Sequence, residues 1–158
     1  MARDITAILS PERLAALRAL FSNEALLDLA RGNFATRYPP ALAFITPLIN
    51  HFFVGDTPME PMIRERLIIA ILASELSNTE LAVHFYWGLM VGLTEAEIAD
   101  TLLLVFGYSG ANEFNNAIDL LERCLTALAA LPDDGLDTIS GVVAVSAVAR
   151  NTWTPPKA

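Results

Sequence analysis

Acidic and histidine side chains are few in the middle of this chain, and their spacing suggests a proton-transfer site. Between positions 67 and 94 they are Glu75, Glu80 and His84. Glu80 and His84 are four residues apart, so on a helix they share one face with Ser77 and Trp87. A carboxylate beside an imidazole holds the ring in one tautomer and raises its basicity, which suits a general acid or base near neutral pH. The pattern predicts His84 as a proton carrier.

Each of these residues also has a purely structural interpretation. Glu80 and His84 can form a solvent-facing pair worth a few tenths of a kcal/mol. Glu65, which stands between two arginines, has the surroundings of a surface ion-pair residue. His51 follows the pattern of a packed or surface histidine, and Cys124 falls within the apolar periodicity of its helix, as an inert core thiol does.

The elements that must position these residues are helices. Apolar residues recur at helical spacing along nearly the whole chain and no useful alternating pattern occurs, so the sequence predicts an all-α fold. Start and stop signals predict helices from 11, from 22 to 32, over 42–53 with a kink at Pro47, over 61–76, 78–91 and 94–107, and from 111 to before 132. Residues 67–73 are apolar on every face, which predicts that the 61–76 helix is the central core helix. After Pro132 the pattern leaves helix and strand both open.

Composition bounds the class of protein. The 158 residues suffice for one domain, 1–158, and 54% are hydrophobic with only 18% charged, against about 25% charged in ordinary soluble domains. Part of this apolar excess is expected in subunit contacts. A net charge of -8 argues against nucleic acid as a partner. One cysteine and two histidines argue against a disulfide, a CxxC pair and a metal centre.

Neither a secretory leader nor a membrane span is expected. Residues 1–10 lack a continuous apolar segment, and no stretch reaches about 18 uninterrupted apolar residues. We therefore expect a cytoplasmic protein with no membrane partner. The apolar segment 139–149 within the tail 135–158 is interpreted as a docking arm for an oligomer.

Several of these motifs occur in an order and spacing that resemble a known family. They are Arg64-Glu65-Arg66-Leu67-Ile68, Glu80-Leu81-Ala82-Val83-His84, Gly88, Gly92-Leu93-Thr94-Glu95-Ala96-Glu97-Ile98, and Tyr108-Ser109-Gly110 with Ala117. Together they resemble the carboxymuconolactone decarboxylase family, which includes the AhpD-type alkylhydroperoxidases. The resemblance covers about residues 62–130 as a family core and implies an AhpD-like helical bundle that assembles as a trimer or hexamer.

The resemblance also implies roles for individual residues. In the peroxidase branch a CxxC pair precedes the histidine, and its two positions fall on Ser77 and Glu80 here. Since neither residue can act as a peroxidatic or resolving thiol, the resemblance argues against peroxidase activity. The decarboxylase branch implies His84 as proton donor, Glu80 as the group that orients it, and Glu65 in a supporting shell or proton relay.

The expected function is therefore cofactor-free acid/base chemistry, a decarboxylation or related proton transfer, on a small lactone or carboxylic acid. Ser77 can offer the substrate a hydrogen bond, and Trp87 an apolar wall. Arg64, Arg66 and Arg123 are candidate cations for a substrate carboxylate. The alternative is a non-catalytic helical oligomer that binds a small apolar ligand or a partner. A third hypothesis is thiol-dependent reduction through Cys124 alone.

Overall fold

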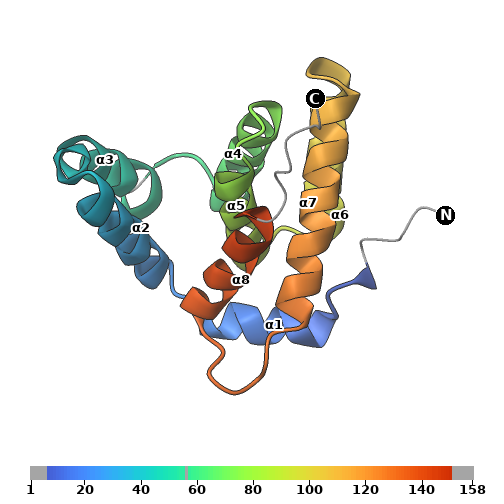
Figure 1. Ribbon diagram of the computed structural model, residues 1–158, viewed down its shortest axis with the longest axis horizontal. Helices are drawn as coiled ribbons and strands as arrows, with labels where there is room; N and C mark the ends of the chain where they lie inside the picture. The colour runs from blue at the N-terminus through green and yellow to red at the C-terminus, as the bar shows by residue number, and fades with distance from the viewer. Residues whose placement is uncertain (1–6, 56, 151–158) are drawn as a thin grey trace, which may run out of the picture.

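The prediction of an all-α chain is confirmed. A computed structural model describes residues 7–55 and 57–150, and these residues form eight α-helices and no β-strand (Figure 1). The helices are α1 Pro11–Leu20, α2 Asn23–Arg37, α3 Leu42–Ile49, α4 Pro61–Ser74, α5 Asn78–Val91, α6 Glu95–Tyr108, α7 Ala111–Ala129 and α8 Thr138–Arg150. A π-helical turn, η3 Asn50–Val54, continues α3. The predicted single domain and tail include residues 1–6, 56 and 151–158, which lie outside the described ranges.

The helices divide into a main body and an arm. The main body consists of α1 and α4 to α8: in Figure 1, α4 to α8 stand side by side and α1 crosses beneath them. The arm consists of α2, α3 and η3, which lie to one side of the body. Within the body, α5 contacts α4, α7 and α8, and the arm reaches the body through contacts between α2 and α8. The arm therefore touches the body along a narrow front, and its residues nearest α4 and α5 are those of η3 and the following loop.

The central helix is α5, so the prediction that the 61–76 helix is wrapped by its neighbours is wrong. Leu81, Phe85 and Tyr86 of α5 are fully buried. By contrast Leu67 and Ile71 of α4 are 50% and 56% exposed. An apolar run shows that a helix can be buried on every side, but only the number of neighbouring helices decides whether it is.

Most local signals at helix ends act as the sequence predicts. The Ser10 side chain accepts a hydrogen bond from the Arg13 amide at 3.1 Å. Thr94 and Glu97 form a reciprocal capping box at the start of α6. Gly92 ends α5 with φ of 123°, a backbone conformation that favours glycine.

Two predictions about the arm need correction. The predicted helix that stops at Gly32 continues to Arg37 as α2, because one glycine costs a helix only about 1 kcal/mol. Pro47 lies inside α3, and the predicted irregularity comes three residues later, where the backbone widens into η3. Such π-helical turns are frequent at functional sites.

The tail that sequence left undecided is helical and packs on its own chain. Helix α8 lies against α5 and α7, and its Gly141 faces the ring of Tyr86. The Tyr86 hydroxyl is buried with no hydrogen-bond partner among the described residues, and burial together with the nearby Asp137 raises the pKa of Tyr86 to about 12. The docking role expected for residues 135–158, and for segment 139–149 within them, stays a prediction, and residues 151–158 lie outside the described part of the chain. No described helix is both long and apolar enough to cross a bilayer.

We expect Gly141→Ala to destabilise the fold, because a Cβ there would lie 2.5 Å from Cζ of Tyr86. Overpacking of this kind costs about 1–3 kcal/mol of unfolding free energy. Gly32→Ala is the matched control, since Gly32 also lies within a helix and nothing would stand within 4 Å of its Cβ. That change should stabilise the protein by up to about 1 kcal/mol. Urea unfolding of both variants measures the difference, and equal effects would contradict the close packing of α8 on α5.

Candidate functional site

A buried carboxylate and an imidazole meet between α4 and α5. The Nδ1 atom of His84 lies 2.8 Å from Oε2 of Glu65. Glu65 is fully buried, whereas the His84 side chain is partly open to solvent. The structure thus joins two of the three predicted catalytic residues, which are nineteen positions apart.

Gly88 permits the close approach of the two helices. It lies one turn after His84 on α5, and a Cβ added there would stand 3.0 Å from Cδ1 of Leu93 and 3.3 Å from Cδ1 of Ile69. The same Cβ would lie 3.8 Å from Cβ of Glu65. A side chain at this position would have to displace the ends of the Leu93 and Ile69 side chains.

Two aromatic rings flank the imidazole. Trp87 lies almost parallel to the His84 ring, with centroids 5.6 Å apart. Phe53 of η3 stacks on Trp87 at 4.5 Å and stands 6.5 Å from His84. Trp87 was predicted at this site from its spacing to His84, whereas Phe53 was not, because no sequence pattern connects residues 50–54 with α5. The π-helical turn η3, which contains Phe53, is seen only in the structure.

Arg64 links the carboxylate to the arm. Its Nε atom lies 3.8 Å from Oε1 of Glu65, and its guanidinium carbon lies 4.7 Å from the centre of the Phe53 ring. Its Nη1 donates to the carbonyl oxygen of Phe52, and Asn23 donates to the carbonyl oxygen of Phe53 at 3.2 Å. The Arg64 side chain is only 11% exposed. These contacts hold η3 against α4 and place Phe53 beside Trp87.

Glu80 does not meet His84, contrary to the expected pair. Glu80 is exposed, and among the described residues no hydrogen bond or ion pair joins it to the ring. Spacing of four residues brings two side chains to one helix face, but the imidazole turns across the helix interface toward Glu65 instead. The orienting contact predicted for Glu80 is made by Glu65, for which a surface ion pair was the structural alternative.

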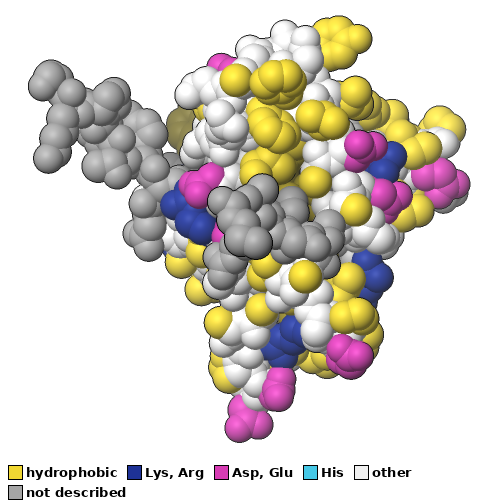
Figure 2. Space-filling model, turned by 90° about the vertical axis from the view of Figure 1, so that its right-hand side faces the viewer, with side chains coloured by type: hydrophobic (Ala, Val, Ile, Leu, Met, Phe, Trp, Pro, Cys, Tyr) yellow, Lys and Arg dark blue, Asp and Glu magenta, His cyan; other side chains and the backbone are white. Residues whose placement is uncertain are grey.

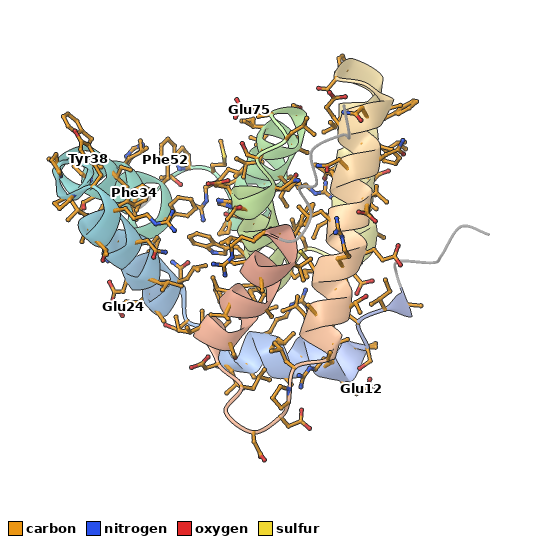
Figure 3. The ribbon with its side chains drawn as sticks, in the orientation of Figure 1. Glu12, Glu24, Phe34, Tyr38, Phe52 and Glu75 are labelled. Atoms are coloured by element: carbon orange, nitrogen blue, oxygen red, sulfur yellow. The ribbon has the colours of Figure 1, made fainter. Side chains whose placement is uncertain are left out.

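The other candidate residues lie apart from the pair formed by Glu65 and His84, which we call the dyad. Ser77 precedes α5 and its side chain caps no backbone amide. Arg66 pairs with Glu97 at 3.1 Å, and Arg123 pairs with Asp119 at 2.6 Å along α7. Glu75 is exposed at the C-terminal end of α4 in Figure 3, ten residues beyond Glu65.

The remaining histidine and the cysteine also lack a catalytic setting. His51 is exposed and contacts the edge of Phe52. Cys124 is buried, and this burial raises the pKa of its thiol to about 12. A thiol with so high a pKa supplies almost no thiolate near neutral pH, which argues against reduction through Cys124. Among the described residues no group of three or more histidine, cysteine and acidic side chains could hold a metal ion.

The geometry favours proton transfer at the outer nitrogen of His84. If Glu65 is ionised, its oxygen accepts the Nδ1 proton, so the lone pair of the neutral ring is on Nε2. Nε2 has no hydrogen-bond partner among the described residues. A ring in this state can take a proton at Nε2 and return it, while the nearby carboxylate stabilises the positive charge that forms.

The comparisons with known proteins add no family. No family model matches the chain, and neither the curated proteins nor the solved structures contain a match. The resemblance described above therefore rests on motifs within residues 62–130, and the function must be argued from the site itself.

We expect Glu65→Gln to lower the free energy of unfolding by roughly 1.5–3 kcal/mol, the usual worth of a hydrogen bond to a charged group. The change removes the charge that faces both Arg64 and His84. Glu80→Gln is the matched control and should stay within about 0.5 kcal/mol of the unaltered protein. Urea unfolding measures both. An equal loss in the two variants would show that Glu65 does not hold the ring.

Proposed function

We propose that this protein is a cofactor-free acid/base enzyme of the carboxymuconolactone decarboxylase type, acting on a small lactone or carboxylic acid. The observation that carries the proposal is the 2.8 Å contact between a fully buried carboxylate and an imidazole whose second nitrogen is unpartnered among the described residues. The arrangement suits a proton carrier better than a structural ion pair, since a structural pair has no need of a partly open ring.

Each residue near the dyad has a defined part in the proposed reaction. When a lactone acid loses CO2, the bond between carbon and the carboxylate breaks and its electron pair remains on carbon, conjugated with a carbonyl. Protonated His84 then donates its Nε2 proton to that carbon. Glu65 holds the ring and stabilises its charged form, while Trp87 packs against the ring face. The guanidinium of Arg64 supplies a cation next to the Glu65 carboxyl group, in a position to attract an acidic substrate.

Residues outside this group have no part in the proposed reaction. Glu80 and Ser77 occupy the positions that carry thiols in the peroxidase branch, so the proposal does not include peroxide reduction. Arg66 and Arg123 are engaged with acidic partners elsewhere on the surface. Of the predicted arginines, Arg64 alone adjoins the dyad.

We expect His84→Ala to lower kcat/KM for a carboxylated muconolactone by about 10²–10⁴-fold, the usual contribution of a positioned acid or base. Its melting temperature should fall, because Glu65 stays buried without its hydrogen-bond partner, so turnover is measured well below the melting temperature of the variant. His51→Ala, which removes the other histidine, should leave turnover unchanged. Release of CO2 from the probe measures the reaction. Normal turnover by the His84→Ala variant would favour the non-catalytic alternative.

The proposal includes assembly of several copies through the apolar surface of the body. The second half of α6 carries no charged residue, and its Leu104 and Tyr108 are 64% and 92% exposed. Figure 2 shows hydrophobic side chains gathered on the upper part of the face on the side of α6 and α7. Monomeric proteins rarely expose a large continuous apolar patch, so a second copy of the chain is the occupant we propose.

Sedimentation equilibrium should then give a mass three or six times the 17.1 kDa of one chain, as the family resemblance implies. Leu104→Glu should shift the protein toward the monomer, because it puts a charge into the apolar surface. Leu20→Glu changes an exposed leucine of α1, below the body in Figure 1, and serves as the control. A monomer at micromolar concentration before any substitution would rule out the proposed assembly.

A further inference from the structure

An open pocket lies between the arm and the body, next to the Phe53 ring that stacks on Trp87 beside the dyad. Its volume is about 290 Å³, near the lower end of the roughly 300–1,000 Å³ typical of small-molecule sites. Phe53 and Arg64 stand in its wall together with Phe21 and Val91. A pocket of this size suits a ligand no larger than one ring with a substituent.

The lining indicates the charge of that ligand. Among the described lining residues Arg64 is the one ionisable group. Phe21, Phe53 and Val91 supply apolar surface, and Asn23 and Thr57 supply polar groups. Two of the Arg64 nitrogens already face protein groups, the Glu65 carboxylate and the Phe52 carbonyl, and Arg64 forms part of the pocket wall. A cation beside aromatic and aliphatic side chains favours a ligand that joins a negative charge to an apolar body.

The pocket is connected to the dyad by the same residues. Val91 is seven residues after His84 and four after Trp87, so all three lie along one face of α5. Phe53 lines the pocket and packs on Trp87, with the His84 ring 6.5 Å away. His84 itself does not line the pocket. The Phe53 ring is therefore the side chain that limits how far a bound molecule extends toward the imidazole.

A second pocket on the other side of Phe53 is a weaker candidate. It has a volume of about 410 Å³, but its wall includes both Glu24 and Arg31. Arg31 already pairs with Asp28 at 2.9 Å and with the Asn50 side chain at 2.8 Å. A wall that carries both a negative and a positive side chain selects no ligand charge.

We infer that the pocket between Phe53 and Arg64 is a binding site for small carboxylates with an apolar ring or branched body, and that Phe53 sets the size it accepts. The guanidinium of Arg64 binds the carboxylate, and Phe21 and Val91 contact the body. This inference names a class of substrate for the proposed function. Only the statement that the bound molecule reacts rests on that function, because binding can be measured without turnover.

Benzoate and its neutral analogue benzamide test the charge requirement. Trp87 and Trp153 are the tryptophans of the chain, so a Trp153→Phe background isolates the fluorescence of Trp87, which stacks on Phe53. We expect benzoate to change this fluorescence and to bind at least tenfold more tightly than benzamide, since a hydrogen bond to a charged group is worth about 1.5–3 kcal/mol. Equal affinities for the two probes would overturn the inference.

Arg64→Gln should weaken benzoate binding about tenfold or more, while Arg64→Lys should retain most of it because the charge remains. Arg66→Gln is the matched control, since Arg66 is two positions along α4 and pairs with Glu97 outside the pocket. A comparable loss in Arg66→Gln, or no loss in Arg64→Gln, would overturn the inference. Thermal melting of each variant shows that the comparison is made on folded protein.

Phe53→Ala tests the size limit. It should raise the affinity for 1-naphthoate relative to benzoate, whereas Phe52→Ala, which changes an exposed neighbour outside the pocket wall, should leave that ratio unchanged. An unaltered ratio in Phe53→Ala would remove Phe53 from the site. His84→Ala separates the two proposals: it should bind benzoate normally. If it does so and still turns over the muconolactone probe, the proposed reaction fails and the binding site stands.

Discussion

The buried carboxyl group of Glu65 is the constraint on which the rest of the site depends. An ionised carboxylate removed from water is costly unless charged or hydrogen-bonding partners surround it, and here the partners are His84 on α5 and Arg64 on α4. To bring the ring within 2.8 Å, the two helices must approach closely, which Gly88 allows. The orientation of the imidazole toward α4 is thus coupled to the burial of the Glu65 carboxyl group.

The same group of contacts ties the arm to the body. Arg64 faces Glu65 on one side and the Phe53 ring and Phe52 carbonyl on the other, so the charge pair and the position of η3 are coupled. Figure 3 places Phe52 on the side of the arm that faces α4. Since the arm otherwise meets the body mainly where α2 touches α8, these contacts determine what lies beside the dyad. The shape of the pocket and the access to His84 therefore depend on residues from three separate segments.

The apolar composition has two different structural outcomes. On α5 it produces a helix buried on most sides, whereas on α4 and α6 it leaves exposed residues such as Ile71 and Leu104. Hydropathy alone could not separate these cases, because a side chain has the same transfer free energy whether a neighbouring helix of the same chain or a second copy covers it. This is why the 61–76 helix was predicted as the core while α5 occupies that place.

Local interactions, which depend on residues a few positions apart, could be predicted from the sequence: the all-α class, the caps at Ser10 and Thr94 and the stop at Gly92. The pairing partner of His84 could not. Spacing favoured Glu80, which shares its helix face, but the carboxylate that reaches the ring is nineteen residues away on another helix, and Phe53 is more distant still. Contacts between helices follow from how their surfaces pack in three dimensions, and only the tertiary structure decides that packing.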